Sequence, residues 1–214
     1  MNWSTGRLER GLLVDWSTGL LEIFKATRMK TLNPGGFLIH PGGYRNLYCY
    51  KKSVILYDMT FYYIEKYLEP SDRTYGQMKQ AARSGKQNIV EGLEDKMTSF
   101  DTGLHLVNVA RGSLQELLED YEDEIRSNRL SLWKNGHERY DGMVQFCLEH
   151  AEVEDYAKYY EQWDQETICN VALTLIHQAD KALMSLLKKM EADFLQEGGV
   201  KERMTAARKD KRGF

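Results

Sequence analysis

Proline is scarce in this sequence of 214 residues, and its scarcity is the first guide to the fold. The three prolines are Pro34, Pro41 and Pro70, so the chain from Ser71 to its end contains none. Because proline breaks the interior of a helix, a proline-free stretch of this length favours long helices.

Cysteines and long apolar runs are also few. The three cysteines (Cys49, Cys147 and Cys169) are odd in number and far apart, which excludes a disulfide framework and a CxxC ligand pair. We expect buried free thiols in a reducing cytoplasm. No apolar run approaches the roughly 18 residues that a membrane span needs. Asp15 and Glu22 interrupt what would be the apolar region of a signal peptide. We therefore expect a cytoplasmic protein with no membrane partner.

The chain has no excess charge of either sign that would identify a partner. Its formal net charge of −3 argues against a globally basic nucleic-acid coat but leaves local patches open. Hydrophobic residues make up 42% and charged residues 29%, which is ordinary for a globular protein and argues against disorder.

Four long stretches have the apolar spacing of amphipathic helices. They run from near Arg45 to Leu68, from about Tyr75 to Lys96, from near Ser99 to Asn128, and from about Glu166 to Gln196. Ser99 is the expected N-cap of the third helix, and Gly198-Gly199 is expected to end the fourth. Steps of three and four lay one apolar seam along each, and three of the helices are joined by short links. We predict an all-α fold, an antiparallel up-and-down four-helix bundle. The seam expected in the first helix is Leu47, Tyr50, Val54, Tyr57, Phe61, Ile64 and Leu68. In the second helix it is Met78, Ala82, Gly85, Ile89 and Leu93, and in the third it is Phe100, Leu104, Val107, Leu114, Leu118, Tyr121 and Ile125. In the fourth helix it is Ile168, Ala172, Leu175, Ala179, Leu183, Leu186, Met190 and Phe194.

The remaining segments define the expected domain limits. Residues 1–43 are an N-terminal extension with a Gly/Pro-rich lead-in, residues 44–197 form the bundle, and residues 198–214 are a basic tail. A long acidic connection over 129–165 precedes the last helix, and we expect one or two short helices in it. Trp3-Ser-Thr-Gly6 recurs as Trp16-Ser-Thr-Gly19. Three interpretations of this stretch stay open: a short interaction helix, a poorly ordered extension, or sequence upstream of a natural start at Met29.

A basic stripe lies on the second predicted helix. No acidic residue occurs from Arg73 to Val90, and Lys79, Arg83 and Lys86 fall on one side of the helix, beside Gln87 and Asn88. Basic side chains with amide neighbours suit contacts with phosphates and base edges. The alternative is a solvated helix face.

Several segments of the chain are similar to one family. The chain resembles the four-helix-bundle family of ribosomal RNA intervening-sequence proteins in Tyr50–Asp58 (YKKSVILYD), Gln77–Ser84 (QMKQAARS), Asn88–Gly92 (NIVEG) and Gly112–Leu117 (GSLQEL). It is still more similar to the branch of four-helix-bundle suffix-domain proteins, in Gly42–Leu47, Ala82–Gly92, Asn108–Arg111, Leu132-Trp133, Leu175–Ala179 and Asp193–Met204. The resemblance covers roughly residues 30–208.

The resemblance implies partners as well as a fold. It implies a ring-shaped homo-oligomer, with a pentamer favoured. The family includes accessory proteins of diversity-generating retroelements, which are similar bundles that contact nucleic acid and a reverse transcriptase. RNA or DNA, and a reverse transcriptase or another protein, are therefore the partners implied here.

Arg111 lies in the middle of the apolar face of the third helix, between Val107 and Leu114. A buried guanidinium must be paired, because an unpaired buried charge is very costly. Family position makes Glu91 the expected partner, with Glu116 next, so we expect a structural ion pair.

Catalytic and metal-binding patterns are missing from the sequence. No two of the five histidines are three or four positions apart, so we expect no metal site. No acid–base or nucleophile constellation suggests an enzyme or a cofactor, and an enzyme dependent on a metal or ligand is the weakest hypothesis.

The leading hypothesis is a non-enzymatic homo-oligomer that binds RNA through Arg73, Lys79, Arg83, Lys86, Gln87 and Asn88, assisted by the basic tail. The alternative is a protein-interaction scaffold or accessory subunit without nucleic-acid contact, docking through residues 138–166 or the Gly/Pro-rich lead-in.

Overall fold

The described part of the chain is helical and contains no strand. The structure, a computed structural model, describes residues 43–96, 99–198 and 200–212. The predictions for the N-terminal extension, the repeated Trp-Ser-Thr-Gly motif and nearly all of the Gly/Pro-rich lead-in lie outside these residues. A 3-10 turn, η2 (Gly43–Asn46), precedes the α-helices, which are α2 (Tyr48–Tyr67), α3 (Arg73–Asp95), α4 (Phe100–Ser127), α5 (Tyr140–Glu149), α6 (Val153–Ala157), α7 (Gln165–Glu197) and α8 (Val200–Arg212).

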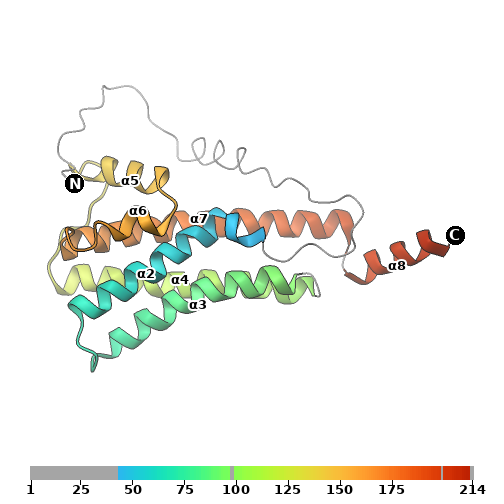
Figure 1. Ribbon diagram of the computed structural model, residues 1–214, viewed down its shortest axis with the longest axis horizontal. Coiled ribbons are helices and arrows are strands. Elements are labelled where there is room, and N and C mark those ends of the chain that lie inside the picture. The colour runs from blue at the N-terminus through green and yellow to red at the C-terminus, as the bar shows by residue number, and fades with distance from the viewer. Residues whose placement is uncertain (1–42, 97–98, 199, 213–214) are drawn as a thin grey trace, which may run out of the picture.

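The four long helices α2, α3, α4 and α7 each pack against two of the others. The contacting pairs are α2 with α3, α3 with α4, α4 with α7, and α7 with α2, so the packing closes into a cycle. Figure 1 shows that successive long helices reverse direction, while the short helices α5 and α6 lie at the end where α4 leads into α7. Helix α8 extends away from the other helices at the opposite end.

Polar caps determine where three of the long helices begin. The side chain of Asp72 accepts from the backbone N–H of Thr74 at 2.8 Å, and Asp164 accepts from Thr167 at the same distance. Ser99 caps α4, as its position in the sequence predicts, by accepting from the N–H of Thr102. These bonds satisfy N–H groups that the first helical turn leaves unpaired. The cap at Asp72 also explains why α3 begins two residues before the predicted start.

The end of α7 depends on one glycine. Gly198 has φ +72°, in the left-handed region that glycine adopts without a side-chain clash. The helix therefore stops where the Gly-Gly pair predicts. The basic segment after it is itself helical, as α8.

The core confirms three of the predicted seams and corrects the first. Met78, Ala82, Gly85 and Ile89 of α3 are buried as expected, as are most of the predicted residues in α4 and α7. In α2 the buried face is instead formed by Cys49, Lys52, Ser53, Ile55, Leu56, Met59, Thr60, Tyr63 and Ile64. Apart from Ile64, the residues expected on that seam are only partly buried. The prediction failed because α2 carries apolar and aromatic side chains on several faces, so that spacing alone did not determine which face is covered.

The connection before α7 contains two short helices, where one or two were expected, and most of its aromatic residues are buried. Trp133, Phe146, Tyr156, Tyr160 and Trp163 are all buried. Helix α6 packs on α2, and α5 packs on α7. The three cysteines are buried with free thiols, as expected. A membrane crossing would need a longer apolar stretch than any helix offers in the described part of the chain.

Candidate functional site

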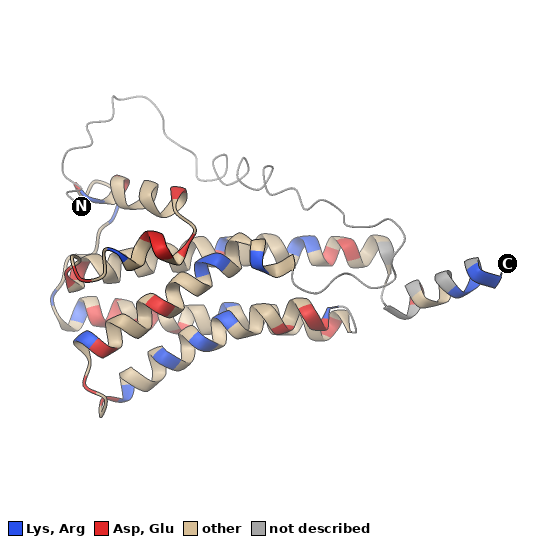
Figure 2. Cartoon of the chain, in the orientation of Figure 1, with Lys and Arg blue, Asp and Glu red and all other residues tan. Residues whose placement is uncertain are grey.

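The predicted basic residues of α3 are brought onto one exposed surface. Arg73, Lys79 and Arg83 are exposed and Lys86 is half-buried; we call these four residues the α3 basic row. Figure 2 shows their blue segments following one another along α3 from its start. The turn geometry explains the alignment of the last three, since residues spaced by three or four positions lie on the same side of a helix.

Aromatic rings from α2 and α3 hold two of these lysines. The ammonium group of Lys79 lies 4.8 Å from the ring centroid of Phe61, and that of Lys86 lies 3.5 Å from the ring centroid of Tyr57. Lys79 also lies 5.9 Å from the ring of Tyr75. Such contacts are favourable because the face of an aromatic ring is electron-rich. The row is therefore bordered by rings that restrain its side chains.

Lys86 is the least available cation of the row. Partial burial lowers the pKa of its amine. The negative charge of Asp58 raises this pKa, and the positive charge of Arg83 lowers it further. Burial in turn raises the pKa of the Asp58 carboxyl, and Lys86 partly offsets that shift. The negative charge of Asp58 weakens the positive field at the Lys86 end of the row, so Arg73, Lys79 and Arg83 are its strongest cations.

The two predicted amide residues form bonds within α3. The Gln87 side-chain amide donates to a carboxylate oxygen of Glu91 at 3.1 Å. Asn88 donates to the carbonyl oxygen and the hydroxyl oxygen of Ser84, each at 2.9 Å. The Ser84 hydroxyl is also bonded to Ser113 of α4. Asn88 therefore supports the α3–α4 contact, and its amide nitrogen is not directed toward a ligand.

The predicted partner of Arg111 was wrong. Its guanidinium makes two hydrogen bonds to the carboxylate of Asp180 in α7: Nε donates to Oδ1 at 2.8 Å, and Nη2 donates to Oδ2 at 3.4 Å. Glu91 instead accepts from Gln87 on the exposed side of α3. The error arises because Arg111 lies at the edge of the apolar face of α4, with its side chain 30% exposed, and that edge adjoins α7. A structural ion pair was expected and is present, but with a different residue.

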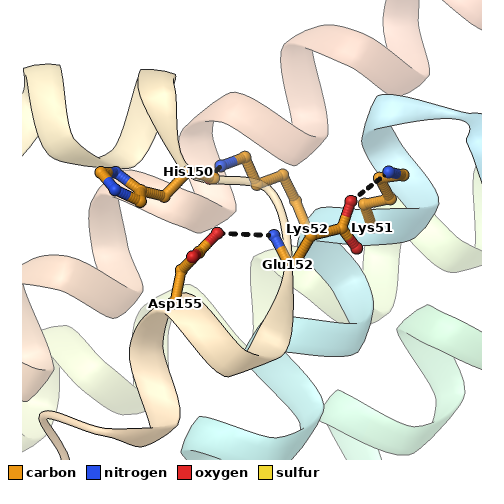
Figure 3. Close-up of polar contacts among 5 residues, drawn as sticks. All are labelled: Lys51, Lys52, His150, Glu152 and Asp155. Atoms are coloured by element: carbon orange, nitrogen blue, oxygen red, sulfur yellow. Dashed lines mark hydrogen bonds and ion pairs between the residues drawn. The ribbon is translucent and has the colours of Figure 1, made fainter.

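Sequence reasoning missed a fully buried lysine. Lys52 of α2 is 0% exposed, and its ammonium group donates to the carbonyl oxygens of Cys147 and His150, each at 2.5 Å. These carbonyls end α5, where a positive charge is favourable because the helix dipole is negative there. The Tyr156 hydroxyl, at 3.4 Å, is the third acceptor. Figure 3 shows Lys51 and Lys52 reaching from α2 to the turn between α5 and α6, where Lys51 pairs with Glu152.

The environment of Lys52 supports a structural role. Burial lowers the pKa of its amine to about 8, and the negative charges of Asp155 and Glu152 partly offset that shift. Burial also raises the pKa of the neighbouring Cys147 thiol to about 12, so the thiol stays protonated at neutral pH and is not an activated nucleophile. An amine with no exposed surface cannot reach a substrate. The spacing of Lys52 with Ile55, Leu56 and Met59 was the signal for its burial, because all four lie on one helical face.

Other surfaces offer little chemistry. A pocket of about 240 Å³ lies between α4, α5 and α7, bordered by Trp133, Tyr140 and His177. Its buried amide, Asn170, is already bonded to the backbone of Trp133 and Ser131. Across the residues that the structure describes, no three His, Cys, Asp or Glu side chains are grouped so as to hold a metal ion.

Comparison with protein-family models, with curated proteins and with solved structures gave no match to this chain. Its function is therefore inferred from the sequence and from the contacts that its own residues make.

Proposed function

We propose that this protein is a non-enzymatic, homo-oligomeric antiparallel four-helix bundle that binds nucleic acid, RNA in the first place, through the α3 basic row. The cyclic packing of α2, α3, α4 and α7 supports the bundle. The resemblance to ribosomal RNA intervening-sequence proteins supports the oligomer and the ligand. A cytoplasmic location belongs to the same proposal.

One observation carries the proposal. The α3 basic row presents three exposed cations on a helix that has no acidic residue between Arg73 and Val90. Phosphate contacts by such cations supply most of non-specific nucleic-acid binding. In a homo-oligomer each copy would add its own row, which would strengthen the field that a polyanion meets.

Helix α8 adds a second basic region. The segment 200–212 contains six basic and two acidic residues. In Figure 2 it lies at the end of the molecule opposite the start of α3, so it is separate from the α3 basic row. We propose that α8 raises the affinity for nucleic acid without changing which nucleic acid is preferred.

The test replaces the three exposed cations of the row together, as Arg73→Gln, Lys79→Gln and Arg83→Gln. Lys86 is left in place because its contact with Tyr57 contributes to packing. A matched control removes three exposed cations elsewhere, as Arg126→Gln, Lys134→Gln and Lys158→Gln. Binding to labelled RNA and DNA is measured by fluorescence anisotropy on nuclease-treated protein over a range of salt concentrations.

The expected result separates the two variants. Wild-type protein should lose affinity with salt with a log–log slope of about −2 to −4, as three or four phosphate contacts imply. The row variant should lose binding while the control retains it, and light scattering should give the same oligomer for both. A wild-type protein that binds no RNA or DNA at low salt would overturn the proposal.

A second function is favoured by one surface of α4. Glu116, Glu119 and Asp123 are exposed there, and burial together with the neighbouring acidic groups raises the pKa of Asp120. A scaffold that docks a basic protein partner, without touching nucleic acid, would use this surface. The segment 138–166 suits that role less well than its sequence indicates, because Tyr156, Tyr160 and Trp163 are buried against the other helices.

A further inference from the structure

The rings beside the α3 basic row form one continuous cluster with its lysines. Tyr57 and Phe61 are one helical turn apart on α2, and their ring centroids are 4.6 Å apart with an angle of 44° between the planes. Lys86 lies over the first ring and Lys79 over the second. Along the seam between α2 and α3, two adjacent rings therefore each have a lysine ammonium group over them.

Phe61 is not needed to fill the interior. Among the described residues, Tyr57 packs against the buried core, whereas Phe61 is absent from the partly buried side chains that do so. Its ring is half-buried and contacts Tyr57 and Lys79 at the surface. A half-buried phenylalanine ring that lies at the surface beside the Lys79 cation suits contact with a planar, anionic ligand better than contact with solvent.

We infer that the Tyr57–Phe61 pair and the α3 basic row together bind single-stranded nucleic acid, with bases stacked on the rings and phosphates at Lys79 and Arg83. This inference rests on the proposed function and names its substrate class. Aromatic side chains inside a basic groove stack unpaired bases, because every base has a flat π face that a ring can cover. In a duplex the base faces are already stacked on one another and reach no side chain.

The carboxylate of Asp58 determines which end of the α3 basic row a nucleic-acid phosphate contacts. Asp58 lies near Lys86 and would repel a phosphate at that end. Phosphates are therefore held toward Lys79 and Arg83, and the bases lie toward α2, where Tyr57 and Phe61 are. RNA and DNA single strands share this chemistry.

The experiment compares probes with unpaired bases, with paired bases and with no bases. The first probe is a labelled single strand of about 12 nucleotides, made as RNA and as DNA. The second is the corresponding duplex, and the third is a phosphate–sugar strand of equal length with no bases. Each is titrated against the full chain, against Phe61→Leu and against the control Phe194→Leu. Phe194 is also a surface aromatic residue, stacked on Phe100 at the far end of α7. Thermal melts verify that both variants fold.

Stacking predicts a specific pattern. Wild-type protein should prefer the single strand to the base-free strand by about tenfold or more, and Phe61→Leu should remove most of that preference while leaving binding of the base-free strand unchanged. Phe194→Leu should bind as wild type. Equal affinity for all three probes, or no effect of Phe61→Leu, would overturn this inference and leave phosphate binding by the row in place. If the wild-type protein binds none of the probes, both the proposed function and this stacking inference are wrong. Comparison of the RNA and DNA arms identifies the preferred single strand.

Discussion

Lys52 and Cys147 are 95 positions apart in the chain, yet the buried amine of Lys52 donates to the backbone carbonyl oxygen of Cys147 at 2.5 Å. The adjacent Lys51 pairs with Glu152 of the next turn. Two consecutive lysines therefore attach the α5–α6 segment to α2, one in the interior and one at the surface. Because Lys52 is buried and Lys51 is partly exposed, the same substitution should change the free energy of unfolding by different amounts at the two positions.

Lys52→Met should lower the free energy of unfolding by about 1–3 kcal/mol, because it removes the lysine donor from the buried carbonyl oxygen of Cys147 and one of the two donors from the carbonyl oxygen of His150. Lys51→Met removes a partly exposed ion pair and should cost less than about 1 kcal/mol. Urea unfolding at neutral pH measures both. Equal losses in the two variants would mean that the carbonyl contacts of Lys52 contribute nothing beyond a surface pair.

Two glycines of α4 should respond in opposite ways to alanine. A Cβ at Gly103 would lie 2.6 Å from the carbonyl oxygen of Gly92, so Gly103→Ala must push α3 and α4 apart. We expect a loss of about 1–3 kcal/mol. A Cβ at Gly112 would meet nothing within 4 Å, so Gly112→Ala should stabilise the helix by about 0.5–1 kcal/mol. Thermal melts test both signs, and a stabilised Gly103→Ala variant would contradict the close approach of α3 and α4.

Arg111 should be coupled to Asp180 and not to Glu91. A double-mutant cycle of Arg111→Met with Asp180→Asn should give a coupling free energy of about 1 kcal/mol, since the pair is half-buried and joined by two contacts. The cycle with Glu91→Gln serves as the matched control and should be additive. Coupling in the control cycle alone would restore the partner that family position implies.

Asp120 should make stability depend on pH in the acid range. Burial, together with Asp123, Glu116 and Glu124, raises the pKa of its carboxyl from 3.8 to about 6. The folded state then holds a proton that the unfolded state releases between about pH 4 and 6, so this contribution to stability is lost as the pH rises through that window. Asp120→Asn should therefore raise the melting temperature at pH 7 and change it little at pH 4. The effect is modest because the group is partly exposed and the like-charged neighbours are worth a few tenths of a kcal/mol each. A larger rise in the melting temperature of Asp120→Asn at pH 4 than at pH 7 would contradict a raised pKa of Asp120 in the folded state.

The amino-acid sequence alone determined the helical class and the positions of the long helices. Proline scarcity, three- and four-residue apolar steps, the Ser99 cap and the Gly198 stop are local signals, and each acts within one or two turns of the chain. The alignment of Lys79, Arg83 and Lys86 is local in the same sense, because helix geometry alone places them on one side of α3.

The tertiary structure decided what lies next to these helices. The buried face of α2, the pairing of Arg111 with Asp180, the capture of the α5 terminus by Lys52 and the rings beside the α3 basic row all join segments distant in sequence. Each depends on which helix packs against which. Steps of three and four cannot decide this where a helix such as α2 is apolar on more than one face, because burial against a neighbour then selects among faces of similar hydrophobicity.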